Sequence, residues 1–136
     1  MDEEAKKKEA PKFDWVSERS RCSVPNVFKE LLLQVEEDVK TRNALRPNNS
    51  PYEFTVEKNG DDFKVILTAN DLQKSVIFSR AEHAILVLEG DDRKTMFEVT
   101  LVFSDEGACK LRVNQQDRDL WQVRRMALEE LLFRSN

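Results

Sequence analysis

Hydrophobic positions recur at helical spacing in the first third of the chain. Between residues 27 and 39 the apolar residues stand three or four positions apart, and acidic residues occupy the other side. This is the pattern of an amphipathic helix. Ser23 can cap the helix, and Pro25 suits its first turn, where a missing N–H leaves no hydrogen bond unmade. Two prolines in the segment 46–51 cannot continue a helix, so we expect it to end near Leu45.

The spacing of the apolar positions then changes to alternation, which predicts β-strands. The alternating segments are 52–57, 63–69, 74–79, 84–89, 95–103 and 108–113. Turn residues separate them, and the Asn59-Gly60 pair is the strongest hairpin signal. Parallel strands need crossovers of a dozen or more residues, and these links are shorter. The pattern therefore predicts a six-stranded antiparallel meander, with the sheet twisted or curled.

A second helical pattern occupies the end of the chain, beginning near Asp117 or Asp119, either of which can cap it. Its apolar arc is wide enough to bury more than one side or to present part of itself to a partner. The layout predicts a single α+β domain over residues 13–136, with an N-terminal helix and a C-terminal helix packed on one sheet face. Residues 1–12 are charged and predict a disordered tail.

Three predicted strands are apolar at consecutive positions, at residues 65–67, 76–78 and 85–88. Both faces of these strands then carry hydrophobic side chains, and helices on one face leave the other uncovered. Burial stabilises by roughly 1.5–3 kcal/mol per large side chain, so we expect a cover for the second face. Three covers are open: a curled sheet, another chain, or the segment holding Phe13 and Trp15. That segment is alternatively a docking motif for another protein.

The composition excludes several classes of partner. The 136 residues carry 22 basic and 26 acidic side chains, a net charge of −4, which opposes binding to nucleic acid and to anionic membranes. The sequence contains no run of about 18 apolar residues, so we expect no membrane-spanning helix. Arg124 and Arg125 beside Trp121 could hold a phosphate, but segment 114–136 has four basic and four acidic residues, so we favour a solvated helix face. No phosphate-binding loop, dinucleotide fingerprint, nucleophile elbow or Cys-x-x-Cys occurs, so we predict no cofactor.

Two cysteines, Cys22 and Cys109, are present. No apolar segment near the first residue resembles a secretory signal, so we expect a cytoplasmic location. In that compartment thiols stay reduced, and we favour two free cysteines, although one bridge between them stays open.

The acidic turns suggest a cation site. In an up-and-down sheet the first, third and fifth turns share one end, and a curled sheet could there combine the side chains of Asp61, Asp62, His83, Asp105 and Glu106. Carboxylates with one imidazole suit a hard cation. Acidic pairs are also ordinary residues of hairpin turns, and we favour that interpretation.

Three functional hypotheses follow. The first is a non-catalytic interaction module that binds itself or another protein through apolar sheet or helix surface, with contacts at Phe13, Trp15, Arg124 and Arg125. The alternative is a carrier or sensor of a small apolar ligand, whose pocket is lined by Tyr52, Phe54, Phe63, Phe78, Phe97 and Trp121. The third is a metal-dependent enzyme using the acidic turns and His83. We favour the first hypothesis and thus expect no catalytic activity.

Overall fold

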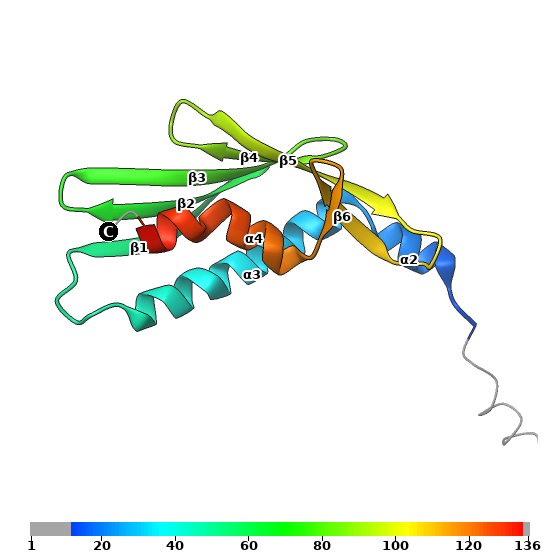
Figure 1. Cartoon of the computed structure of the whole chain (residues 1–136), viewed down its shortest axis with the longest axis horizontal. Coiled ribbons are helices and arrows are strands. Elements are labelled where there is room, and N and C mark those ends of the chain that lie inside the picture. Colours follow the sequence, from blue (N-terminus) through cyan, green and yellow to red (C-terminus); the bar gives the residue numbers. More distant parts are fainter. Residues whose placement is uncertain (1–11, 135–136) are drawn as a thin grey trace, which may run out of the picture.

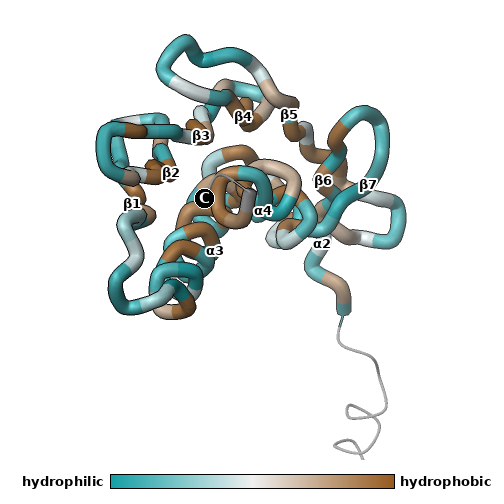
Figure 2. The backbone as a smooth tube through the Cα atoms, turned by 60° about the vertical axis from the view of Figure 1, so that its left-hand side comes forward, coloured by the Kyte–Doolittle hydropathy of each residue, from teal (hydrophilic) through white to brown (hydrophobic). Residues whose placement is uncertain are grey.

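The computed structural model describes residues 12–134, in which a curved antiparallel sheet arches over two long helices (Figures 1 and 2). The predicted disordered tail, residues 1–12, lies outside the described residues except for Lys12. In chain order the elements are α2 (Trp15–Arg21), α3 (Val24–Leu45), β1 (Tyr52–Asn59), β2 (Asp62–Ala69), β3 (Leu72–Arg80), β4 (Ile85–Glu89), β5 (Lys94–Phe103), β6 (Cys109–Val113), β7 (Gln116–Arg118), α4 (Leu120–Glu129) and the π-helical turn η1 (Glu130–Arg134).

The sheet is a meander in which each strand pairs with the next, in the order β1 to β7. The predicted α+β class and antiparallel topology are confirmed, with seven strands instead of six. The missed strand, β7, has three residues, all polar. The turn before it holds Asn114 and Gln115 in the left-handed region, at φ 54° and 67°. Gln is uncommon in that conformation, so the sequence carries no clear turn signal there.

The two long helices begin at the predicted caps. The Ser23 hydroxyl accepts a hydrogen bond from the Asn26 N–H, and the Asp119 N–H donates to the Gln122 side chain at 2.7 Å. Helix α2 was not predicted. It begins after Asp14, whose carboxylate accepts hydrogen bonds from the hydroxyl and the N–H of Ser17, at 2.6 and 3.1 Å. These hydrogen bonds lower the pKa of Asp14, and the bond from the Ser17 hydroxyl contributes most.

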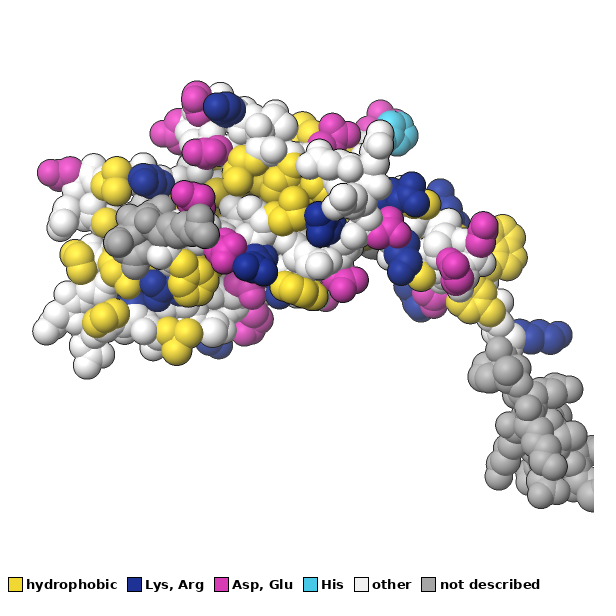
Figure 3. Space-filling model, viewed as in Figure 1, with side chains coloured by type: hydrophobic (Ala, Val, Ile, Leu, Met, Phe, Trp, Pro, Cys, Tyr) yellow, Lys and Arg dark blue, Asp and Glu magenta, His cyan; other side chains and the backbone are white. Residues whose placement is uncertain are grey.

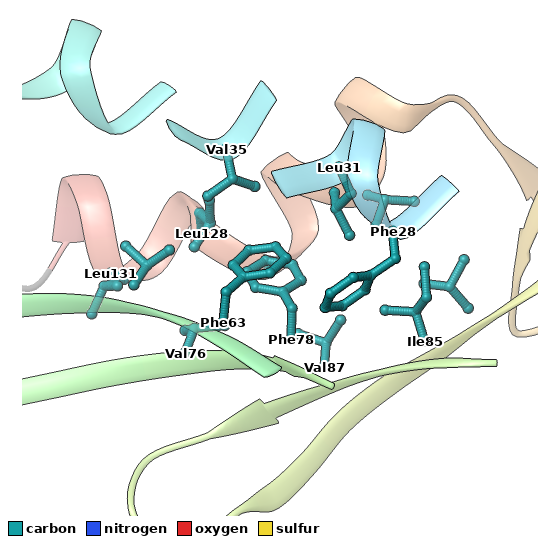
Figure 4. Close-up of a cluster of buried hydrophobic side chains, with 14 of the residues drawn as sticks. Phe28, Leu31, Val35, Phe63, Val76, Phe78, Ile85, Val87, Leu128 and Leu131 are labelled. Atoms are coloured by element: carbon teal, nitrogen blue, oxygen red, sulfur yellow. The ribbon is translucent and has the colours of Figure 1, made fainter. Parts of the chain in front are cut away.

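Aromatic side chains form the centre of the core, between the inner face of the sheet and the helices (Figure 4). The Phe63 ring of β2 stacks on Phe78 of β3 with centroids 4.6 Å apart. It also meets Phe28 of α3 at 5.1 Å. All three are buried, so these contacts fix α3 against the sheet.

The outer face of the sheet carries a second, smaller set of buried apolar side chains. Ile66, Ile77 and Leu88 are only 5–6% exposed although they stand outside the main core cluster. The β4–β5 turn reaches back over this face, where Arg93 pairs with Asp62 of β2 at 3.2 Å. The sheet curves toward the helices and away from this face (Figure 2), so the expected curl around the outer face is not what the structure shows. The chain buries this face by itself, so the face gives no argument for a partner.

The segment holding Phe13 and Trp15 does not cover the outer face, contrary to one of our alternatives. Both side chains are more than half exposed. The Phe13 ring lies against Gly107 in the β5–β6 turn, so closely that a Cβ at position 107 would come within 2.5 Å of it.

Cys22 and Cys109 form a disulfide, with their Cα atoms 5.3 Å apart. The expectation of two reduced thiols was wrong, because the fold brings the end of α2 to the first residue of β6. Disulfides persist in oxidising compartments. The cytoplasmic location stays a prediction, but the reduced thiols that it implied are not found.

Helix α3 covers the free edge of the sheet at β1. The Asn43 side-chain amide donates to the carbonyl of Phe54 at 2.7 Å and accepts from the N–H of the same residue at 3.0 Å. Arg46 donates to the carbonyl of Tyr52. These bonds occupy backbone groups that an unprotected edge strand would offer to another chain.

We expect Asn43→Ala to lower the free energy of unfolding by about 2 kcal/mol, because it leaves a partly buried N–H and C=O without partners. Urea denaturation measures the change. Asn26→Ala is the control: its side chain makes one exposed 3.4 Å bond to Ser20, and we expect a change within about 0.5 kcal/mol. Equal losses in the two variants would contradict the role of Asn43.

Candidate functional site: the α3–α4 groove

A groove of about 360 Å³ lies between α3 and the continuous α4–η1 helix. We call it the α3–α4 groove. Its lining residues are Asp38, Thr41, Arg42 and Leu45 of α3, Trp121, Arg124, Arg125, Leu128 and Glu129 of α4, and Leu132 and Phe133 of η1. Leu128 and Leu132 are buried, whereas Leu45, Trp121 and Phe133 are 71%, 52% and 62% exposed. The groove thus joins large exposed apolar side chains to a buried apolar floor.

The two helices that form the groove run side by side in the same direction (Figure 1). Arg124 of α4 binds Asp38 of α3, with Nε and Oδ2 2.6 Å apart, and also donates to Gln34. Further along, four residues after Asp38 and eight after Arg124, Arg42 Nε donates to the carbonyl oxygen of Leu132 at 2.8 Å. These contacts hold the helices in parallel and keep the groove at a fixed width.

Arg42 lies at the far end of the groove among aromatic rings. Its guanidinium carbon is 5.0 Å from the ring centroid of Phe133, 5.5 Å from that of Phe54 and 5.6 Å from that of Tyr52. Such cation–π contacts contribute about 0.5–2 kcal/mol each, more where water is excluded. The contact with Arg42 therefore fixes the position of the exposed Phe133 ring.

The charged side chains of the groove are mostly paired. Besides Arg124 with Asp38, Arg125 binds Glu129 one turn later at 3.3 Å. The lining contains no histidine, cysteine or serine. An apolar centre with a charged rim is the anatomy of a protein–protein interface. The arrangement is therefore suited to binding.

The structure brings three residues of the predicted sites together here. Trp121, Arg124 and Arg125 line the groove. Trp15 begins α2 and Phe13 precedes it, at the end of the fold where β6 lies (Figure 1), and neither lines the groove, so the interaction residues do not form one surface. Leu45 was not among the predicted site residues, because its position indicated only the end of a helix.

The residues proposed to line an apolar pocket do not form one. Phe54, Phe63 and Phe78 are at most 1% exposed and pack in the core. Tyr52 and Phe97 are partly buried against the same core. Helix α3 fills the space that a curled sheet alone would have left open.

The acidic turns do not form a cation site. Asp61 pairs with Arg80 at 2.7 Å, and Asp62 pairs with Arg93. The nearest acidic partner of the exposed His83 is its neighbour Glu82, at 3.7 Å. Within residues 12–134 no three His, Cys, Asp or Glu side chains lie close enough to hold a metal ion. The predicted site does not form, because arginines pair with two of its carboxylates and because no three of its possible ligands lie together.

Glu106 and Asp105, the acids of the fifth turn, also lie outside any such group. The Glu106 carboxylate accepts a hydrogen bond from its own backbone N–H and another from Ser104, and these lower its pKa. Its role is local to the β5–β6 turn.

A second hollow, of about 530 Å³, opens between the start of β3, the β4–β5 hairpin and α4. Figure 3 shows hydrophobic side chains gathered between that hairpin and α4. Seven of its thirteen lining residues are nevertheless polar or charged, of both signs. The α3–α4 groove is therefore the better candidate for an apolar contact.

None of the helices in the part of the chain that the structure describes has the length and apolarity to cross a bilayer. Comparison with protein-family models, with characterised proteins and with solved structures gives no match. The functional argument therefore depends on the geometry of the fold and of the groove.

Proposed function

We propose that this protein is a non-catalytic interaction module that associates with a second copy of itself through the α3–α4 groove. The observation that supports it is the exposure of Leu45, Trp121 and Phe133 around one apolar floor. Large aromatic side chains dominate the binding energy of protein interfaces, and Trp most of all. Monomeric proteins rarely leave such side chains together in water.

The other surfaces of the fold are less suited to association. Helix α3 covers the edge of the sheet at β1, and the strand at the other edge, β7, has only three residues. The chain itself buries both faces of the central strands. Folding leaves apolar side chains exposed at the α3–α4 groove and at Phe13, Trp15 and Val16, and of these regions the groove joins them to a buried apolar floor.

We expect the protein to dimerise, and Trp121→Ala to raise the dissociation constant of the dimer about 100-fold. Each dimer loses two Trp121 side chains, and about 1.4 kcal/mol for each corresponds to that factor. Sedimentation equilibrium over a dilution series measures it. Leu72→Ala is the matched control, because Leu72 is 44% exposed on β3 and lies outside the groove. A wild-type protein that stays monomeric at the highest concentration, or equal effects of the two substitutions, would contradict the proposal.

A further inference from the structure

We propose, on the basis of the self-association above, that the two copies pack with their α4 helices antiparallel, about a two-fold axis at the level of Ala127. In such a pair the residue that lies a given number of positions before 127 meets the residue that lies equally far after it. The lining of the groove is complementary to itself under this operation. Two observations show this, one apolar and one charged.

The apolar observation is the placement of the two exposed rings. Trp121 stands six positions before residue 127 and Phe133 six positions after it, and both line the groove, so the rings mark its two ends. The two-fold axis brings Trp121 of each copy to the Phe133 end of the other, beside Leu45. The contact occurs twice, as a closed two-fold interface requires.

The charged observation is the Arg125–Glu129 pair. Arg125 stands two positions before 127 and Glu129 two positions after it. Both side chains are exposed, at 63% and 41%. Within one chain they lie one helical turn apart, and the Arg125 nitrogens are 3.3–3.4 Å from the Glu129 carboxylate oxygens. Pairs of this kind contribute little in water. The antiparallel arrangement brings Arg125 of each copy to Glu129 of the other.

The same residues disfavour the parallel arrangement. With the α4 helices parallel, Arg125 would face its own counterpart and Glu129 likewise, and like charges across an interface are unfavourable. Arg124 is engaged with Asp38 inside the chain, so it keeps α3 and α4 together in either case. Charge therefore selects the antiparallel pairing.

Two charge-reversal variants test the arrangement. In Arg125→Glu both positions 125 and 129 are acidic, and in Glu129→Arg both are basic, so each homodimer carries like charges at both contacts. We expect the dissociation constant of each homodimer to rise at least tenfold. An equimolar mixture restores opposite charges at both contacts, and we expect heterodimers at close to the wild-type affinity. Native mass spectrometry with one variant labelled with ¹⁵N counts the three species, and Lys94→Glu, an exposed reversal on β5, is the control.

The mixture distinguishes contact between chains from the contact within one chain. If Arg125 and Glu129 bind only each other in one chain, both variants lose that contact and mixing restores nothing. Homodimers and heterodimers of equal affinity would therefore overturn the antiparallel register, while a Trp121-dependent dimer would still support the groove as the interface. A wild-type protein without dimers would instead refute the proposed function itself.

Discussion

Replacement of both cysteines by alanine, in Cys22→Ala/Cys109→Ala, is expected to lower the free energy of unfolding by about 4 kcal/mol. The bridge joins residues 87 positions apart, and it restricts the unfolded chain more strongly as the closed loop grows. A small domain is stable by only about 5–15 kcal/mol. The bridge therefore supplies a large part of the stability.

Urea denaturation with and without a reductant measures this effect and contains its own control. The wild-type protein in reductant should unfold at the midpoint of the double variant, and the variant itself should not respond to reductant. If the wild-type midpoint were the same in both conditions, the bridge would be absent in solution and the thiols reduced, as the sequence had led us to expect.

The consequences of the bridge are local as well as global. Helix α2 buries none of its seven residues, and its cap at Asp14 and its ion pair between Glu18 and Arg21 lie within the segment itself. Apart from Phe13 against Gly107, the bridge is the main attachment of this segment to the sheet. Reduction should therefore accelerate amide hydrogen exchange in α2 before it does so in α3, whose buried side chains pack in the core.

The features that the sequence predicted are those set by neighbouring residues. The hydrophobic period and the cap at Ser23 located α3, and alternation with short polar turns located six strands and their antiparallel order. Such signals need no knowledge of distant parts of the chain. The seventh strand was missed because the turn before it places Gln115 in the left-handed region, which Gln rarely adopts.

The features that the sequence did not predict depend on contacts between distant segments. The groove exists because Arg124 binds Asp38, 86 positions earlier, and holds α4 parallel to α3. The disulfide depends on the position of α2 beside β6. Aromatic residues in strands are compatible with a ligand pocket or with a core. The position of α3, whose Phe28 contacts Phe63, shows that these residues form the core.

That aromatic core gives the last expectation: Phe63→Ala should lower the free energy of unfolding by about 4 kcal/mol, because it opens a cavity among well-packed side chains. The Phe63 ring is fully buried and contacts both Phe78 and Phe28. Urea denaturation measures the loss. Leu33→Ala is the control: Leu33 is 52% exposed on α3, so we expect its free energy of unfolding to change by no more than about 0.5 kcal/mol.

The same substitution connects the core to the groove. Phe28 belongs to α3, so loss of its contact with Phe63 loosens the helix that forms one wall of the groove. Phe63→Ala should therefore weaken dimerisation although residue 63 does not line the groove, whereas Phe63→Leu, which keeps most of the volume, should leave the dimer nearly intact. A dimer unaffected by Phe63→Ala would show that the groove does not depend on this core contact.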